Sequence, residues 1–578
     1  MGKTPQKKQI KRRILLIQAL LVGSVFLLGA RSFEVQIFKS HDLTRKAEQG
    51  YSKHLTIKGE RGQILDRHLN KLGTSIDAPT ITADPSQILE PSRTAVALSK
   101  ILDIKQTDLK ATLSREGRFA VIARKVSPAQ AKQIRDLDIQ GIYLKNDSKR
   151  FYPNRNLAAQ VIGFTGKDDS GLEGLEFKYN AVLEGEEVKI KVKRDGTGRV
   201  LDIHKNRRNQ LKGNSLVLTI DKKIQFLSER TLEQTVKDNQ AKSGMALVMK
   251  PATGELLAIA HYPGFNPNNF KISSKVTYRN RAITDAFEPG SVIKVFTVAA
   301  ALEKGFSPKS IFFCENGEYR IGKFTIHDTH PHDWLTLNQI IKFSSNIGVT
   351  KISETIGKKT LHDYLSNFGF GLKTGMGCPG ETNGNLLPHK RWSKIDTSAI
   401  SFGQGLSVSA IQLISGICAI ANDGMLMKPM LIKKIISNQG HDLQVFQPTP
   451  LRQVVSPKTA AQVKTMMNLV VQEEGTGTKA AMQGYRVCGK TSTAQKARKG
   501  KPGYETNKYI AGFAGFAPQE NPELAILVVI DEPQKQYYGG QLAAPAFKTI
   551  MAQSFNYLNI APEPTKTMIA AVTKGEEN

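Results

Sequence analysis

The chain has 578 residues, 40% of them hydrophobic, which predicts a folded protein of two or three domains and excludes a disordered one. Its 81 Lys and Arg against 51 Asp and Glu give a formal net charge of +30, which favours anionic partners. The basic residues form separate patches and no nucleic-acid-binding motif accompanies them, so nucleic acid is not an expected partner; the four cysteines have no paired spacing, so buried free thiols are expected.

The first predicted element is a membrane helix. Ile14 to Ala30 is uncharged and rich in Leu, Ile and Val, and at 1.5 Å per residue it spans about 25 Å. We expect an uncleaved anchor over residues 14–33. A cleaved signal peptide is less favoured, because the apolar run is long and the small-x-small cleavage pattern is poor.

The charges around this segment predict its orientation. Six Lys or Arg lie between Lys3 and Arg13, whereas only Arg31 and Lys39 follow the apolar run closely. Positive charge stays on the cytoplasmic side of membrane helices. Residues 1–13 are therefore expected in the cytoplasm, and the chain after the anchor outside it, on the periplasmic face of the inner membrane.

Residues 34–212 contain short strands broken by polar turns and no run that could form a large helical core. Two helical patches, Pro91–Ile104 and Ser127–Leu137, interrupt the strands, and Asp195–Gly198 has the composition of a hairpin turn. We expect an elongated, noncatalytic pedestal that serves in docking or dimerisation.

Residues 213–561 alternate strands with long helices, as in a single large α/β domain, and residues 562–578 form a tail. The expected elements are a strand at Leu216–Ile220, a helix at Asp221–Lys237, and strands at Met245–Met249, Glu255–Ala260 and Glu523–Ile530.

The first chemical motif in this region is a serine followed three residues later by a lysine. Pro289-Gly290 predicts a turn, and apolar residues then recur at helical spacing, so Ser291 lies at the start of a buried helix with Lys294 on the same face. A desolvated lysine with a lowered pKa can accept the proton of a serine hydroxyl. Taken alone the motif is weak, because a capping serine beside a solvent-facing lysine gives the same pattern.

Two later motifs strengthen the chemical interpretation. Ser344–Asn346 follows an amphipathic stretch and supplies a hydroxyl for proton relay and an amide for binding a peptide. Lys490–Thr493 lies on a strand that begins near Arg486, where a cation and hydroxyls can bind a carboxylate. The order S-x-x-K, S-x-N, K-T-small is that of the penicillin-recognising serine acyltransferases.

With these motifs, the chain resembles the class B penicillin-binding proteins, and most of all the division-specific (septal, FtsI-type) peptidoglycan transpeptidases. Further stretches similar to that family are Arg61–Arg67, Arg150–Pro153, Gly171–Glu176, Arg279–Ala282, Phe368–Gly371, Gly403–Gly405 and Tyr537–Gly540.

The resemblance implies a multidomain α+β and α/β fold: one transmembrane helix, a strand-rich pedestal, and a C-terminal transpeptidase domain with a serine β-lactamase-like sheet and flanking helices. It implies D-Ala-D-Ala transpeptidation that cross-links stem peptides at the septum without a cofactor or metal. The implied partners are the peptidoglycan stem pentapeptide, β-lactams as inhibitors, a polytopic inner-membrane glycosyltransferase and other division proteins.

The resemblance also implies a role for each motif residue. Ser291 is expected to be the nucleophile, Lys294 the base and Ser344 a proton shuttle. Asn346 is expected to hold the donor peptide, and the terminal carboxylate is expected to bind Lys490, Thr491 and Thr493, with Ser345 and Ser492 as further substrate contacts. The backbone N–H groups of Ser291 and Thr493 are expected to form the oxyanion hole.

One residue departs from the family pattern, which normally has glycine at position 492. Glycine on a strand allows a substrate backbone to approach closely, whereas Ser492 adds a hydroxymethyl group on the side of Lys490. We expect transpeptidation to be retained and β-lactam affinity to be altered.

Several alternatives remain open at this point. The chain could be an elongation-type class B transpeptidase, a β-lactamase or sensor with the same serine chemistry, or a catalytically weak scaffold of the division machinery. A zinc site in the histidine-rich segment His327–Asp333 is disfavoured, because its spacing fits no common metal motif and a surface loop accounts for it.

Overall fold

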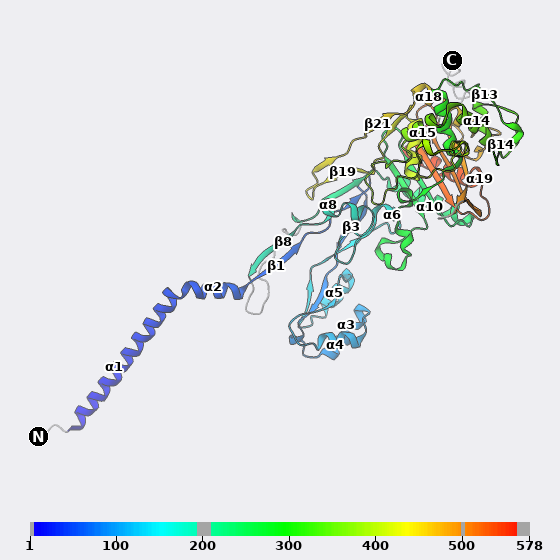
Figure 1. The fold of residues 1–578 in the computed structure, drawn as a ribbon. Coiled ribbons are helices and arrows are strands. Elements are labelled where there is room, and N and C mark those ends of the chain that lie inside the picture. Colours follow the sequence, from blue (N-terminus) through cyan, green and yellow to red (C-terminus); the bar gives the residue numbers. More distant parts are fainter. Residues whose placement is uncertain (1–4, 194–209, 499–502, 563–578) are drawn as a thin grey trace, which may run out of the picture. The chain divides into compact units, whose positions relative to one another are not determined.

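The structure is a computed structural model that describes residues 5–193, 210–498 and 503–562 (Figure 1). The hairpin expected at Asp195–Gly198 and the tail after residue 562 lie outside these residues. The chain forms two compact units, residues 1–60 with 185–212, and residues 61–184 with 213–578.

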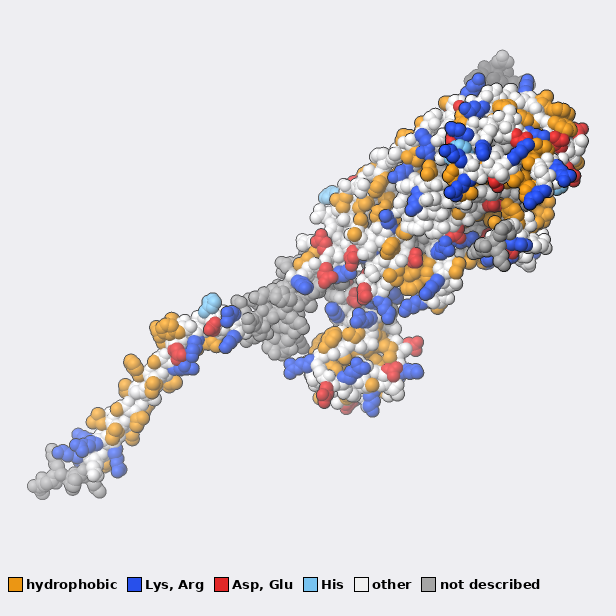
Figure 2. Space-filling model, in the orientation of Figure 1, with side chains coloured by type: hydrophobic (Ala, Val, Ile, Leu, Met, Phe, Trp, Pro, Cys, Tyr) orange, Lys and Arg blue, Asp and Glu red, His pale blue; other side chains and the backbone are white. Residues whose placement is uncertain are grey.

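The smaller unit contains the N-terminal helix. Among the described residues, one segment, Lys7–Phe38, is long and apolar enough to cross a membrane, and none of its apolar window is buried by the rest of the protein. Figure 2 shows hydrophobic side chains along this helix and Lys or Arg side chains gathered at its N-terminal end. These features fit a single-pass membrane anchor. The unit comprises α1 (Pro5–Phe33), a π-helical turn (Glu34–Phe38), α2 (Ser40–Tyr51), β1 (Ser52–Lys58) and β8 (Glu187–Lys193), with β1 and β8 antiparallel.

In the larger unit, a six-stranded sheet joins pedestal residues to residues of the C-terminal region. Its order is β20-β19-β9-β2-β3-β7, and β2 pairs in parallel with β9. The domain boundary expected between residues 212 and 213 lies just before β9, and the strands on its two sides meet at the β9–β2 pair in the middle of this sheet. The strands are β2 (Ile64–Leu65), β3 (Lys71–Asp77), β7 (Ser148–Phe151), β9 (Ser215–Leu218), β19 (Ile432–Ile436) and β20 (Asp442–Val445).

Three of the family-like pedestal stretches meet in one buried ion cluster. The carboxylate of Glu176 accepts hydrogen bonds from Arg61 Nε and Arg150 Nε, each at 2.6 Å, and from the Tyr152 hydroxyl at 3.2 Å. All four side chains are buried. Because a buried charge is costly without a partner, this arrangement links segments up to 115 residues apart in the sequence.

A small α/β lobe extends from the same unit and has its own hydrophobic core, which includes Leu98, Leu109 and Ile134. Its helices α3 and α5 confirm the two helical patches expected from the sequence. The lobe comprises β4 (Thr80–Ala83), β5 (Ala120–Ala123), β6 (Ile142–Lys145), α3 (Pro91–Leu102), α4 (Gln106–Leu113) and α5 (Pro128–Asp136); short helices α6 (Ala159–Ile162), α7 (Gly174–Lys178) and α8 (Asn180–Leu183) follow.

The C-terminal region is built on a five-stranded antiparallel sheet of order β11-β10-β24-β23-β22. Along β10, Ala246 and Val248 pack in one core with α10 and α19, whereas Met245 and Leu247 pack in the other core with α12 and α17. This alternation is that of a sheet covered by helices on both faces. The elements are β10 (Ser243–Met249), β11 (Leu256–Tyr262), β22 (Cys488–Ala497), β23 (Tyr504–Ala517), β24 (Leu524–Asp531), α10 (Lys222–Asp238), α12 (Lys294–Glu303), α17 (Ala410–Ala421) and α19 (Gly539–Leu558).

The strands and the helix expected at the start and end of this region are all present, with ends that differ by a few residues. The remaining strands of this region form two-stranded sheets, β12 with β17, β13 with β16, β14 with β15 and β18 with β21. The remaining elements are α11 (Arg281–Thr284), α13 (Leu337–Phe343), α14 (Asn346–Ile356), α15 (Lys358–Asn367), α16 (Lys394–Ser401), α18 (Pro457–Leu469), β12 (Ala286–Phe287), β13 (Ile311–Phe313), β14 (Glu318–Ile321), β15 (Phe324–His327), β16 (Trp334–Thr336), β17 (Val408–Ser409), β18 (Met425–Met427) and β21 (Pro450–Gln453).

Candidate active site

The serine of the first motif lies in a single 3-10 turn, Gly290–Ile293, and α12 begins only at Lys294. The helix expected from Ser291 onward thus starts one turn later, and Ser291 itself is half-buried at the turn. Gly290 N donates to Gly403 O at 3.1 Å, and a Cβ on Gly403 would lie 2.0 Å from Gly290 O. Position 403 therefore requires glycine. The Gly403–Gly405 stretch, which is similar to the family, packs against the turn that carries Ser291 and accepts its hydrogen bond from Gly290 N.

Lys294 is fully buried and its ammonium group is directed at the second motif. Nζ donates to Ser344 O at 2.5 Å and to Asn346 Oδ1 at 2.7 Å, and lies 3.3 Å from Ser344 Oγ. Burial lowers the pKa of Lys294 to about 7, against the opposing effect of the Asp328 carboxylate. A large fraction of this lysine is therefore uncharged at neutral pH and able to accept a proton.

Lys490, from the third motif, reaches the same hydroxyl from β22. Its Nζ lies 2.8 Å from Ser344 Oγ and is also fully buried. Burial, and then the charge of Lys294, hold the pKa of Lys490 well below its usual value. Ser344 adopts the left-handed conformation (φ 60°, ψ 42°) at the end of α13, which places its hydroxyl between the two lysine nitrogens.

The side chains of the third motif divide between the two faces of β22. Ser492 Oγ donates to Pro289 O at 2.6 Å, beside the serine turn, and the half-buried Thr493 hydroxyl accepts a hydrogen bond from Gly539 N at 3.0 Å. The Thr491 hydroxyl is buried and pairs with Thr476 Oγ1 at 2.9 Å. The Thr491 hydroxyl thus has a partner within the protein, and its expected contact with the substrate carboxylate stays a prediction.

Ser345, which is expected to contact the substrate, has a role within the fold. It is 2% exposed and caps α14, where Oγ accepts from Gly348 N at 2.8 Å and donates to Asp328 Oδ2 at 2.5 Å. The other Asp328 oxygen accepts from the backbone N–H groups of Asn346 and Ile347. A carboxylate at this helix N-terminus is favourably placed against the helix dipole.

Asp328 is the functional residue that sequence reasoning missed. It lies in the histidine-rich segment for which the sequence predicts a surface loop, and it positions Asn346 while its charge acts on Lys294. No local pattern marks it, since its partners lie more than fifteen residues further along the chain.

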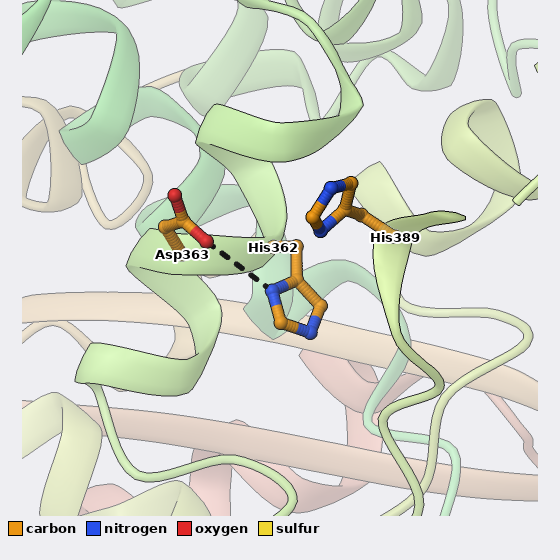
Figure 3. Close-up of side chains that lie close together, drawn as sticks. All are labelled: His362, Asp363 and His389. Atoms are coloured by element: carbon orange, nitrogen blue, oxygen red, sulfur yellow. Dashed lines mark hydrogen bonds and ion pairs between the residues drawn. The ribbon is translucent and has the colours of Figure 1, made fainter. Parts of the chain in front are cut away.

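The histidines of that segment do not meet as metal ligands among the described residues, where one group of candidate ligands is found elsewhere: His362, Asp363 and His389 (Figure 3). His362 Nδ1 lies 3.4 Å from one Asp363 oxygen, and Lys359 Nζ donates to the other at 2.7 Å. A cation would have to compete with this ammonium group, so the cluster is already neutralised by the protein.

Taken together, the site brings a serine on a tight turn, a lysine with a near-neutral pKa, a shared hydroxyl and a second buried lysine to one edge of the sheet. The contacts of Lys294 Nζ are with Ser344 and Asn346, and Ser291 lies three residues before it on the turn. A nucleophilic alcohol served by a base of this kind is suited to acyl transfer. Because β22 is an edge strand, it also offers backbone groups to an extended peptide.

Comparison with known proteins covers nearly the whole chain. Residues 244–552 match the penicillin binding protein transpeptidase domain, and residues 56–218 match the penicillin-binding protein dimerisation domain. The chain is 35% identical to the peptidoglycan D,D-transpeptidase FtsI of Escherichia coli, over 98% of this chain and 94% of that protein. It is 34% identical to the probable peptidoglycan D,D-transpeptidase PenA of Neisseria meningitidis, over 99% and 97%. Penicillin binding protein 3 from Mycobacterium tuberculosis, complexed with aztreonam, has a TM-score of 0.69 at 28% identity, over 88% of this chain and 98% of that one.

Proposed function

The chain belongs to the class B penicillin-binding proteins and is a serine-type peptidoglycan D,D-transpeptidase, and from this premise we propose that it cross-links stem peptides at the division septum. The observation that carries the catalytic part of the proposal is the contact of Lys294 and Lys490, from segments almost 200 residues apart, with the one hydroxyl of Ser344.

In the first half-reaction, the Ser291 hydroxyl attacks the carbonyl carbon of the penultimate D-Ala, and uncharged Lys294 accepts its proton. The bond to the terminal D-Ala breaks, and the departing amine receives a proton through the Ser344 hydroxyl, which exchanges protons with both lysines. In the second half-reaction, the amine of another stem peptide attacks the acyl-enzyme and its proton returns to Ser291 by the same route.

The substrate is held by groups on β22 and α14. The Thr493 hydroxyl accepts from Gly539 N, so its own hydrogen can be donated to the terminal carboxylate of the substrate. The backbone N–H groups of Ser291 and Thr493 serve as the oxyanion hole. Asn346 uses Oδ1 for Lys294 and one amide hydrogen for His327 O at 2.8 Å, which leaves its second amide hydrogen for a carbonyl of the donor peptide.

Covalent labelling by a fluorescent penicillin tests the enzymatic part. We expect one stable adduct on the native protein, mapped to Ser291 by mass spectrometry, and none on Ser291→Ala. Ser228→Ala is the control, since Ser228 Oγ is buried without a hydrogen-bond partner in the described structure. Failure of the native protein to label would indicate a scaffold, and rapid loss of the adduct a β-lactamase.

The cellular part of the proposal has the N-terminus in the cytoplasm and the catalytic domain in the periplasm, with a polytopic inner-membrane glycosyltransferase as partner. The basic residues before the apolar helix support this orientation. The Arg279–Ala282 flank of the nucleophile segment, by its likeness to septal enzymes, supports division over elongation. Depletion in the native host is expected to give filamentous cells, and rounded cells would assign the chain to elongation.

A further inference from the structure

The acidic pair Asp531–Glu532 at the end of β24 is buried, with Asp531 6% exposed and Glu532 9% exposed. Glu532 has a left-handed backbone (φ 51°), a conformation that costs energy in a residue other than glycine, and its N–H donates to Tyr509 O at 2.9 Å. Two adjacent buried carboxylates are unfavourable without counter-charges. Two segments that border the active site supply them.

One counter-charge comes from the edge strand β22. Lys496 Nζ donates to Asp531 Oδ1 at 2.7 Å and to Glu532 Oε1 at 2.5 Å. Lys496 lies where the pairing of β22 with β23 is irregular, between Gln495 and Ala497. Such irregularities weaken the pairing of a strand with its neighbour. The two ion pairs therefore hold the end of β22 at the point where its backbone pairing is interrupted.

The second counter-charge comes from the segment that leads to the nucleophile. Arg281, in α11, donates through Nη2 to Asp531 Oδ2 at 3.1 Å and through Nε to Asp285 Oδ2 at 3.0 Å. Asp285 is followed directly by β12, and the chain then enters the turn that carries Ser291. One oxygen of Asp531 thus binds Lys496, and the other binds Arg281.

The Asp531 carboxylate lies on the face of the sheet that carries the catalytic groups of β22. Asp531 is opposite Ile510, which is opposite Ala494. Directly opposite residues of antiparallel strands have their side chains on the same face. Ala494 is two residues from Ser492 and four from Lys490, so all of these side chains share that face.

We propose that Asp531 is a positioning residue for the acyl transfer, which fixes the end of β22 through Lys496 and the segment before Ser291 through Arg281. Glu532 is the second anchor of Lys496. Asp531 thereby sets the distance between the strand that holds the peptide and the serine that attacks it. The inference rests on the acyl-transfer function proposed above, and it assigns to the acidic pair a role that is exerted only through its basic partners.

The test measures acylation of the full-length protein in detergent by stopped flow, with a fluorescent penicillin as the probe. The concentration dependence separates the dissociation constant of the noncovalent complex from the acylation rate constant. We expect Lys496→Met to lower the rate constant about tenfold or more, ~1.4 kcal/mol, with the dissociation constant within about twofold of native, because a small misplacement of the reacting groups slows the chemical step most. Asp531→Asn weakens both connections and should slow acylation at least as much.

Lys496→Arg keeps the positive charge and can bind both carboxylates, so it should restore the rate constant to within about threefold of native. Glu532→Gln is a milder variant that leaves the ion pair of Lys496 with Asp531 intact, and it should slow acylation about threefold.

Lys434→Met is the matched control. Lys434 Nζ donates to Asp442 Oδ1 at 2.8 Å between β19 and β20, and its side chain is 29% exposed, against 22% for Lys496. This variant should lose similar stability in thermal melting and retain the native acylation rate.

Native acylation rates in Lys496→Met and Glu532→Gln would overturn the inference. So would a loss in Lys496→Met that Lys496→Arg does not restore, or an equal loss in Lys434→Met, since either would assign the ion pairs to stability alone. If the native protein itself is not labelled, the acyl-transfer function is refuted and this inference with it, whereas a labelled native protein with unaffected variants refutes only the role of Asp531.

Discussion

Substitution of Ser492 tests how the nucleophile turn is held against β22. Ser492 Oγ is buried and donates to Pro289 O at 2.6 Å, two residues before the nucleophile. Ser492→Ala removes this bond and leaves a carbonyl without its partner. A hydrogen bond contributes a net ~1 kcal/mol, and an unsatisfied buried group costs about 1–3 kcal/mol. If about 1–2 kcal/mol of this is lost in positioning Ser291, acylation slows by roughly 5- to 30-fold.

Three substitutions at this position separate the hydrogen bond from the space that the side chain fills. Ser492→Thr keeps the hydroxyl and is expected to acylate within about twofold of the native rate. Ser492→Gly loses the bond and adds about 0.5–1 kcal/mol of backbone freedom, yet opens space beside Gly290, whose Cβ position lies 2.6 Å from Ser492 Oγ. Glycine should therefore slow a small penicillin more than a bulky cephalosporin.

The assay is stopped-flow acylation with a small and a bulky β-lactam, accompanied by thermal melting. Ser228→Ala is the control, a buried serine with no hydrogen bond to lose, and should retain the native rate. The reasoning fails if Ser492→Ala and Ser492→Gly acylate both compounds at the native rate. A lowered melting temperature with unchanged acylation would show that the bond only stabilises the fold.

Three other substitutions probe charges around the site and the pedestal. Asp328→Asn removes the carboxylate that raises the pKa of Lys294, so the acid limb of the acylation–pH profile, near pH 7 in the native protein, should move to lower pH; an unmoved limb would contradict this. Glu176→Gln leaves two buried arginines without a counter-charge and should cost about 3–5 kcal/mol in denaturant unfolding, while a loss below about 1 kcal/mol would argue that the cluster is replaceable. Burial raises the pKa of Glu229 from 4.5 to about 7, so the native fold binds its proton more tightly than the unfolded chain and loses stability as pH rises through that range; thermal melts of Glu229→Gln should fall less steeply, and parallel curves would refute this.

The regular elements of the C-terminal region were predictable because their signals are local. β10 and β11 are short apolar runs around a Pro-Ala-Thr-Gly turn, and α10 begins at Asp221, whose side chain accepts from the N–H groups of Lys223 and Ile224. Such alternation and capping depend on neighbours within a few residues. The element boundaries accordingly agree with the structure to within a few positions.

The pairing of β2 with β9 was not predictable in this way. These strands are about 150 residues apart in the sequence, and no local pattern states which distant strand each will meet. The change in sequence pattern near residue 213 predicts a domain boundary, and the strands on its two sides pair in one sheet.

The orientation of Thr491 could have been deduced from the sequence. Side chains alternate along a strand, so once Lys490 and Ser492 are directed at the nucleophile turn, Thr491 must lie on the other face. There it pairs with Thr476. By the same alternation Thr493 lies on the face of Thr491, so the face alone does not decide which of the two threonines contacts a substrate.

The pKa values of Lys294 and Lys490 could not be predicted from the residue types in the motifs. A lysine three positions after a serine has a pKa near 10.4 if it is solvated, and only burial and its neighbours bring the pKa of Lys294 to about 7. Both lysines donate to Ser344, and their mutual repulsion disfavours two charges at once. A proton shared among the two lysine nitrogens and the Ser344 hydroxyl can move to the leaving amine without a large change in the net charge of the buried site. The lowered pKa of each lysine depends on the three segments that carry these groups coming together in the fold.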